Sequence, residues 1–147
     1  MFRIKDKDVS LKFYTEVLGM ELIHEMCGGD FSNYFVAFPE PGMENASKEE
    51  RAARRLKREG VIELCHNHGT ESDPNFKGYA SGNDEPGRGF GHIAISCEDV
   101  DKECERLDAL GVKFKKRPSE GRMRHIAFIY DPDGYWIELV PQSGNGA

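Results

Sequence analysis

An internal repeat is the feature that most constrains the fold of this chain. The tripeptide Ile-Glu-Leu occurs at residues 62–64 and again at 137–139, each time in a short apolar run typical of a β-strand. The segments that lead to each copy follow the same order: one strand, one helix and three further strands. Such a duplication predicts two equivalent structural units.

In the first half, one helix is expected over residues 6–18, where Val9, Phe13 and Leu18 form an apolar stripe and Gly19 ends the pattern. Strands are expected over residues 1–5, 20–24, 34–38 and 61–66. In the second half, a helix is expected over 99–110, ending at Gly111. The strands there are expected over residues 92–97, 112–115, 126–130 and 135–140, with a hairpin turn at 131–134.

These elements predict an α+β fold of two βαβββ repeats, whose curved mixed sheets form a cleft. The predicted organisation is a first repeat over 1–69 with a charged excursion at 39–60, a linker loop over 70–91, a second repeat over 92–141 and a flexible tail over 142–147. The linker is rich in Gly, Asn, Asp and Pro, and long ordered loops of this kind tend to be functional.

Composition excludes several classes of function. The formal net charge of −6 argues against a nucleic-acid or anionic-membrane binder, because both need an excess of Lys and Arg. The chain shows no apolar run long enough for a membrane span and no signal-peptide pattern, so a cytoplasmic location is expected. The four cysteines form no CxxC or finger spacing and are interpreted as small buried side chains.

Side-chain alternation places three metal-binding side chains on matching strand faces. Glu63 and Glu138 occupy the same position in the two repeated strands, and His92 is expected to face the same side as they do. Carboxylate oxygens and an imidazole nitrogen suit a divalent cation such as zinc. Taken singly, each glutamate could face solvent and His92 could be a hydrogen-bonded core residue. His66 and His68 form a competing metal pair, interpreted as surface loop chemistry.

Five strings together resemble the glyoxalase I (lactoylglutathione lyase) family of the vicinal-oxygen-chelate superfamily. They span essentially the whole chain: KFYTEVLGMELI, IELCHNHGTE, GRGFGHIAIS, LGVKFKKRP and DPDGYWIEL. The excursion before residue 61 and the long loop before residue 92 are similar to the eukaryotic, zinc-type branch. The resemblance implies isomerisation of the methylglyoxal–glutathione hemithioacetal to S-lactoylglutathione, with glutathione as cosubstrate and a role in methylglyoxal detoxification.

The resemblance also implies residue roles. Glu63, His92 and Glu138 match the family's metal ligands, with Zn²⁺ expected and Ni²⁺ or Co²⁺ as alternatives. Glu138 matches the glutamate that removes the substrate proton, while the metal stabilises the enediolate as a Lewis acid. The family's substrate contacts fall on Arg3 and Asn67 for the γ-glutamyl end, on Arg88, Lys116 and Arg122 for the glycine carboxylate, and on Phe31, Phe35 and Met123 for the apolar pocket.

Each of these substrate residues has a simpler interpretation: the charged ones as solvated surface groups, the apolar ones as core. A fourth family ligand, glutamine or histidine, aligns ahead of Met1. The expectation is therefore either that the chain begins inside the natural first strand or that three protein ligands and water hold the metal. The family builds its site across a homodimer interface, so a homodimer is expected. The alternatives are an impaired, N-terminally truncated member that binds metal or glutathione conjugates without turnover, or another enzyme on the same scaffold, such as an epimerase or dioxygenase.

Overall fold

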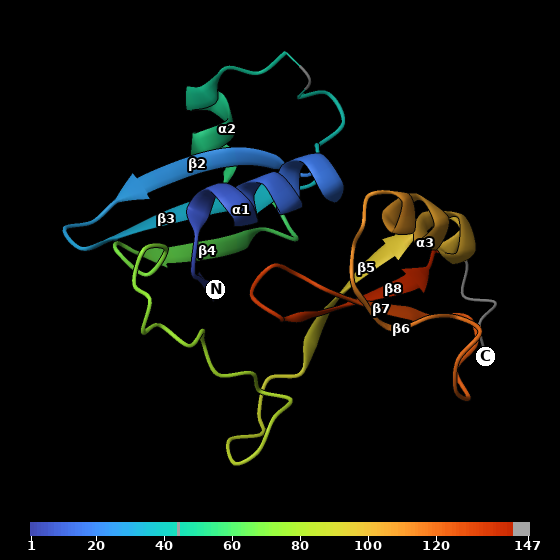
Figure 1. Cartoon of the computed structure of the whole chain (residues 1–147). Helices are drawn as coiled ribbons and strands as arrows, with labels where there is room; N and C mark the ends of the chain where they lie inside the picture. Colours follow the sequence, from blue (N-terminus) through green and yellow to red (C-terminus); the bar gives the residue numbers. More distant parts are fainter. Residues whose placement is uncertain (44, 143–147) are drawn as a thin grey trace. The chain divides into compact units, whose positions relative to one another are not determined.

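A four-stranded mixed sheet forms the framework of each half of the chain. In this computed structural model, which describes residues 1–43 and 45–142, the chain divides into two units, Met1–Tyr79 and Ala80–Ala147 (Figure 1). Both sheets are open, and each unit follows the order β-α-β-β-β, with one additional helix in the first. The predicted α+β class with two βαβββ repeats is confirmed.

The first sheet has the strand order β1-β4-β3-β2. Its strands are β1 (Phe2–Ile4), β2 (Glu21–Cys27), β3 (Phe31–Ala37) and β4 (Ile62–Asn67). β1 runs parallel to β4, and the other pairs are antiparallel. β2 and β3 extend further toward each other than predicted, because the turn between them is short and closes with a hydrogen bond from the Gly28 N–H to the Phe31 carbonyl (2.8 Å).

The helix predicted over residues 6–18 is divided into two parts. α1 (Lys7–Lys12) begins at the N-cap Asp6, and a π-helical turn, η1 (Phe13–Val17), continues it across one face of the sheet (Figure 1). The Leu18 N–H donates to the Phe13 carbonyl, five residues back (3.0 Å). The wider turn allows the consecutive aromatic residues Phe13 and Tyr14 both to be buried. The apolar stripe could not distinguish this from a regular helix.

The charged excursion contains α2 (Lys48–Arg54), which begins at Ser47 with a complete capping box formed by Ser47 and Glu50. Some basic residues of the excursion contact the rest of the protein, while others are exposed to solvent. Arg51 and Arg58 both pair with the carboxylate of Glu21, at the start of β2. The basic run therefore anchors the excursion to the first sheet.

The second sheet has the strand order β5-β8-β7-β6. Its strands are β5 (His92–Cys97), β6 (Phe114–Lys116), β7 (Ala127–Tyr130) and β8 (Trp136–Pro141). α3 (Val100–Ala109) packs on one face through the buried side chains of Val100, Cys104 and Leu107. The core between them is completed by Ile129, Ile137 and Leu139.

Turns and helix ends follow the predicted signals. Gly19 and Gly111 follow the two predicted helices with φ of 78° and 74°, a conformation that glycine adopts without strain. In the hairpin turn, the Asp131 carboxylate accepts the N–H groups of Asp133 (3.0 Å) and Tyr135 (2.8 Å). Of the predicted tail, residues 143–147 lie outside the described residues.

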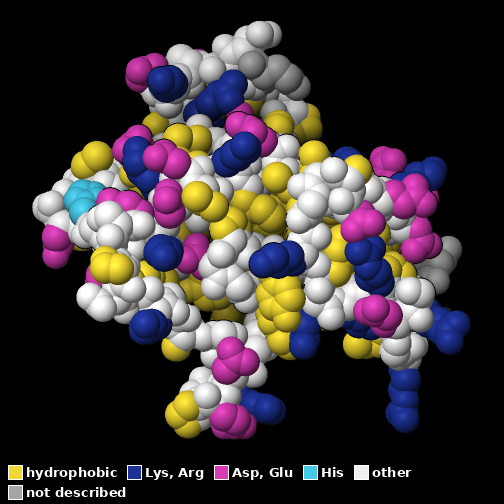
Figure 2. Space-filling view, in the orientation of Figure 1, with side chains coloured by type: hydrophobic (Ala, Val, Ile, Leu, Met, Phe, Trp, Pro, Cys, Tyr) yellow, Lys and Arg dark blue, Asp and Glu magenta, His cyan; other side chains and the backbone are white. Residues whose placement is uncertain are grey.

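The surface carries acidic and basic side chains interspersed over the face seen in Figure 2. Within residues 1–43 and 45–142, none of the helices is long and apolar enough to cross a membrane.

Candidate functional site

One face of the first sheet gathers all five candidate site residues of that unit. Neighbouring strands place directly paired residues on the same face, and the register pairs Phe31 with Asn67 and Phe35 with Glu63. Arg3 of β1 pairs with Cys65, which lies between Glu63 and Asn67 on that face. The predicted alternation along β4 is therefore confirmed by the register. We call these residues, together with Asn33 and Cys65, the first polar face.

A hydrogen bond fixes the carboxylate of Glu63. The side-chain amide of Asn33 donates to Glu63 Oε1 at 2.6 Å, and Asn33 is only 7% exposed. The other amide atom, Asn33 Oδ1, is buried without a hydrogen-bond partner in the described part of the chain. Sequence reasoning missed Asn33, because the strand was expected over residues 34–38 and did not include it, whereas β3 begins at Phe31.

Polar and cationic groups also contact Asn67 and Phe35 of the first polar face. The Asn67 side-chain amide donates to the Tyr79 hydroxyl at 3.0 Å. The ring of Phe35 lies 5.7 Å from that of His24, and the Arg55 guanidinium lies 5.9 Å from its centroid. Phe35 is therefore bordered by groups that can contact a polar ligand, which is unusual for a residue that only packs a core.

In the second unit, the structure brings His92 and Glu138 together. They lie on the adjacent parallel strands β5 and β8, and His92 Nε2 is 3.1 Å from Glu138 Oε2. The side chains are 38% and 18% exposed, so both are reachable from solvent. Phe128 borders the pair: its ring meets the His92 ring edge to face at 5.1 Å and the Trp136 ring at 6.1 Å. The result is a polar pair beside an aromatic cluster of Phe128 and Trp136.

Of the three cations predicted to bind the glycine carboxylate, Lys116 and Arg88 contact other groups of the protein, and Arg122 is exposed. Lys116 Nζ donates to the backbone carbonyls of Arg117 (3.2 Å), Met123 (2.6 Å) and Ile126 (2.9 Å). It therefore holds the loop before β7, on which Arg122 and Met123 are exposed. Arg88 lies in the loop before β5 and pairs with Glu85 at 2.9 Å, with its side chain 71% exposed.

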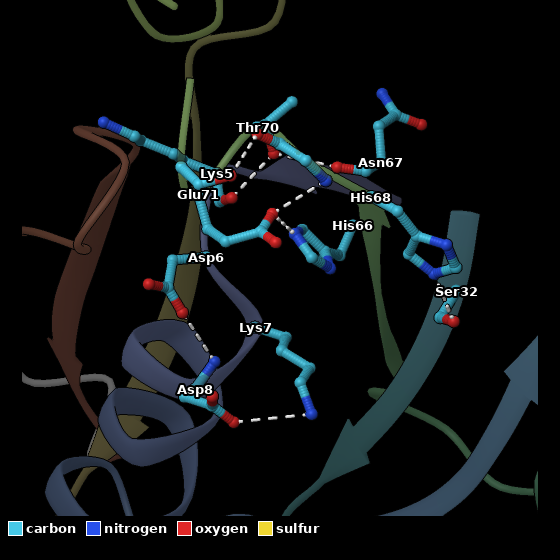
Figure 3. A network of polar contacts seen from close by, with 12 residues as sticks. Lys5, Asp6, Lys7, Asp8, Ser32, His66, Asn67, His68, Thr70 and Glu71 are labelled. Carbon is cyan, nitrogen blue, oxygen red and sulfur yellow. Dashed lines mark hydrogen bonds and ion pairs between the residues drawn. The ribbon is translucent and has the colours of Figure 1, made fainter. Parts of the chain in front are cut away.

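The competing pair, His66 and His68, does not form a metal site. His66 Nε2 lies 2.8 Å from Glu71 Oε2, and His68 Nε2 lies 2.9 Å from the Ser32 hydroxyl (Figure 3). Their ring centroids are 5.7 Å apart, and each ring is hydrogen-bonded to a different group. This cluster is a structural hydrogen-bond network.

The donor chemistry of the remaining candidates fits a divalent cation. Imidazole nitrogen and carboxylate oxygen are the ligands that zinc takes, and a ligating carboxylate is itself commonly hydrogen-bonded, as Glu63 is by Asn33. Among the residues that the structure describes, however, no group of three or more His, Cys, Asp or Glu side chains is close enough to hold a metal ion. The structure shows a two-donor pair in the second unit and one oriented carboxylate in the first.

Comparison with known proteins identifies the family. The sequence pattern of the Glyoxalase/Bleomycin resistance protein/Dioxygenase superfamily matches residues 1–139. The chain is 49% identical to a lactoylglutathione lyase of Pseudomonas putida over 142 residues, covering 95% of this chain and 81% of that protein. It is 50% identical to a lactoylglutathione lyase of Schizosaccharomyces pombe over 97% of this chain, but spans only 46% of that relative's length.

Solved structures agree with the sequence comparisons. A trypanothione-dependent glyoxalase I of Leishmania major superposes with a TM-score of 0.67 at 30% identity, covering 97% of this chain and 83% of that one. Glyoxalase I of Zea mays superposes with a TM-score of 0.64 at 31% identity, covering 96% of this chain and 42% of that one. The two relatives described above are lactoylglutathione lyases and the two solved structures are glyoxalase I enzymes, and the chain belongs to the Glyoxalase/Bleomycin resistance protein/Dioxygenase superfamily.

Proposed function

We propose that this chain is a metal-dependent lactoylglutathione lyase, which isomerises the hemithioacetal of methylglyoxal and glutathione to S-lactoylglutathione. The observation that carries the proposal is the His92–Glu138 pair, whose nitrogen and oxygen lie 3.1 Å apart beside the ring of Phe128. It occurs in a chain 49% identical to a lactoylglutathione lyase over 95% of its length. A glyoxalase I needs a carboxylate that can reach a substrate carbon, and Glu138 is half-buried yet accessible.

The proposed ligands of the metal are Glu63, His92 and Glu138, with Zn²⁺ as the expected ion and Ni²⁺ or Co²⁺ as alternatives. Their nitrogen and oxygen donors suit such a cation. When bound, a divalent cation acts as a Lewis acid that stabilises negative charge on the substrate oxygens. The hydrogen bond from Asn33 supports the role of Glu63, because it leaves one carboxylate oxygen, Oε2, for another partner.

Glu138 is the proposed base. Its carboxylate removes the proton from the hemithioacetal carbon that carries the sulfur, and the electron pair of that C–H bond forms the enediol double bond to the adjacent carbon. Glu138 then returns the proton to that adjacent carbon, and the hydroxyl proton of the former hemithioacetal carbon passes to the oxygen of the former ketone. The former ketone thereby becomes the hydroxyl-bearing carbon, and the former hemithioacetal carbon becomes the thioester carbonyl. The reaction is redox-neutral overall and consumes no co-reactant.

The remaining predicted residues are proposed to bind the glutathione moiety. Arg3 and Asn67 take the γ-glutamyl end, while Arg88, Lys116 and Arg122 take the glycine carboxylate. Lys116 would exchange one of its three carbonyl contacts for the carboxylate. Local cations are required because the protein as a whole carries a net charge of −6 and would otherwise repel an anionic substrate. Phe31, Phe35 and Met123 are proposed to line the pocket for the aldehyde-derived group.

The direct test is to load the full chain with Zn²⁺, add methylglyoxal and glutathione, and follow the absorbance of the thioester. Thioester formation above the rate without protein supports the proposal. Binding of S-hexylglutathione without any thioester would replace it with the non-catalytic alternative, a member that binds glutathione conjugates. Absence of both would refute it. The homodimer is tested separately, by light scattering coupled to size-exclusion chromatography, and the cytoplasmic location stays a prediction.

A further inference from the structure

The chain that follows β4 forms a tight turn closed by a hydrogen-bond network (Figure 3). One oxygen of Glu71, Oε2, lies 2.8 Å from His66 Nε2 and accepts the backbone N–H of Gly69 at 2.9 Å. The carboxylate of Glu71 thus connects the C-terminal end of β4, at His66, with the loop that follows the strand, at Gly69. Asn67, a proposed substrate contact, lies inside this bridged segment.

His66 is an unexpected residue for its position. It is 4% exposed and lies on the core face of β4, paired with Ile4 on one side and Ser32 on the other. An ionised carboxylate only accepts hydrogen bonds, so Nε2 donates to Glu71. The second ring nitrogen, Nδ1, is buried with no hydrogen-bond partner in the described part of the chain. An apolar residue would avoid this desolvation cost, so the histidine must contribute something that packing alone does not.

Thr70 ties the same turn to the neighbouring strand. Its hydroxyl oxygen lies 2.7 Å from the carbonyl of Lys5 and 2.9 Å from the carbonyl of Asn67. Lys5 directly follows β1, the three-residue strand that carries Arg3. A strand this short gains little alignment from its own ladder, so the Thr70 contact helps to fix its register against β4.

The side chain of Asn67 points to the opposite face from His66, and its amide donates to the Tyr79 hydroxyl at 3.0 Å. The backbone of Asn67 is thus held on the core side by the network, and its side chain is held on the other side by Tyr79. Arg3 and Asn67, the two proposed γ-glutamyl contacts, lie on β1 and β4, and the turn after β4 holds the ends of both strands through its hydrogen bonds.

We propose that His66 and Glu71 are positioning residues for ligand binding: their hydrogen bond fixes the turn that orients Asn67 and, through Thr70, the strand of Arg3. This inference rests on the proposed function, because it assumes that Asn67 contacts the glutathione moiety. It predicts that the network acts on ligand affinity through Asn67, beyond its effect on stability.

The test is a double-mutant cycle, with S-hexylglutathione titrated into the Zn²⁺-loaded full chain by calorimetry. Glu71→Ala removes the acceptor of both hydrogen bonds and is expected to weaken binding roughly three- to tenfold, the cost of about one lost hydrogen bond. Glu71→Gln keeps an acceptor oxygen in the same place and is expected to stay within about twofold of the unmodified chain, less than half of one such hydrogen bond. Asn67→Ala is expected to weaken binding, and adding Glu71→Ala to it is expected to have little further effect.

A matched control separates positioning from stability. Ser47→Ala removes the N-cap of α2 in the same unit and is expected to lower the melting temperature without changing the affinity for S-hexylglutathione. His66→Gln retains a donor toward Glu71 and is expected to bind as the unmodified chain does, whereas His66→Leu is expected to bind as Glu71→Ala does. These two variants keep the test valid if Glu71→Ala fails to fold.

The outcomes are distinguishable. Weaker binding by Glu71→Ala and by Asn67→Ala, non-additive in the double variant, supports the inference. Weaker binding by Asn67→Ala alone overturns the inference and leaves the proposed function standing. Additive losses also overturn it, because Glu71 would then act independently of Asn67. If the unmodified chain does not bind S-hexylglutathione, or if Asn67→Ala binds it with unchanged affinity, Asn67 is not a contact of the glutathione moiety. The inference, which assumes that contact, is then overturned as well.

Discussion

Replacing Asn33 by leucine is expected to weaken zinc binding about tenfold while changing the free energy of unfolding by about 1 kcal/mol or less. Asn33 is buried, and its side-chain amide donates to Glu63 Oε1 at 2.6 Å. This hydrogen bond orients the carboxylate of Glu63, a proposed metal ligand. Leucine has nearly the same shape and can fill the same space between Phe31 and Phe35. The substitution therefore removes the orientation of Glu63 with little loss of packing.

The two energetic contributions to stability oppose each other. A hydrogen bond to a carboxylate contributes about 1.5–3 kcal/mol, which the variant loses. The buried Oδ1 of Asn33, which has no hydrogen-bond partner among the described residues, costs about 1–3 kcal/mol, and the variant recovers this free energy. Because these nearly cancel, the effect should appear in metal affinity, where loss of an outer-shell partner typically costs about 10- to 100-fold.

The assay is competition for Zn²⁺ against a chromophoric chelator, with urea unfolding of the metal-free chain measured in parallel. Ser32→Ala is the matched control, since Ser32 is the adjacent buried polar residue of β3, faces the opposite side and bonds to His68. Unchanged zinc affinity and normal stability in Asn33→Leu would show that the Asn33–Glu63 hydrogen bond does not orient Glu63 for zinc. So would an equal loss of zinc affinity in Ser32→Ala.

Three further predictions concern titration, reactivity and the loop before β7. Burial raises the pKa of the Cys104 thiol to about 11, so at pH 8 iodoacetamide should label the exposed Cys27 well before Cys104, as mass spectrometry of the digested protein would show. Hydrogen bonds from its own backbone N–H, His66 and Gly69 lower the pKa of Glu71. The ionised Glu71 carboxylate therefore stabilises the folded protein fully above the pKa that this carboxyl has in the unfolded chain, and this stabilisation is lost as the pH falls through its lower folded pKa. Glu71→Gln should reduce the decrease of the free energy of unfolding at acid pH, measured by urea unfolding at a series of pH values. Lys116→Met removes the ammonium that binds three carbonyls and should speed tryptic cleavage after Arg122, with no comparable change after Arg54.

The repeat was sufficient to predict the architecture. The two Ile-Glu-Leu strings are β4 and β8, and each lies in its sheet between a parallel neighbour and an antiparallel one. Alternation along a strand has a fixed period, so it also predicted the common face of His92 and Glu138, which the register of β5 with β8 confirms. Both depend only on backbone geometry and strand pairing.

Interactions between distant residues could not be predicted. The π-helical turn at Phe13 depends on how two consecutive aromatic side chains are buried, which the apolar stripe does not reveal. The hydrogen bond of Asn33 with Glu63 joins two strands that lie 30 residues apart in sequence. The ion pair of Arg88 with Glu85 and the three carbonyl contacts of Lys116 depend on loop conformation. The joint role of Glu63, His92 and Glu138 as metal ligands stays a proposal.

Glu138 is proposed to move the substrate proton in a metal-dependent isomerisation, and this role can be measured. Its most direct test is the rate of thioester formation as metal-free protein is titrated with Zn²⁺, measured for the unmodified chain, Glu138→Gln and the control Glu105→Gln, which changes an exposed glutamate on α3. We expect no turnover without metal, activity that rises with added Zn²⁺ in the unmodified chain and in Glu105→Gln, and a loss of at least about 100-fold in Glu138→Gln. Full activity in the metal-free chain, or in Glu138→Gln, would contradict it.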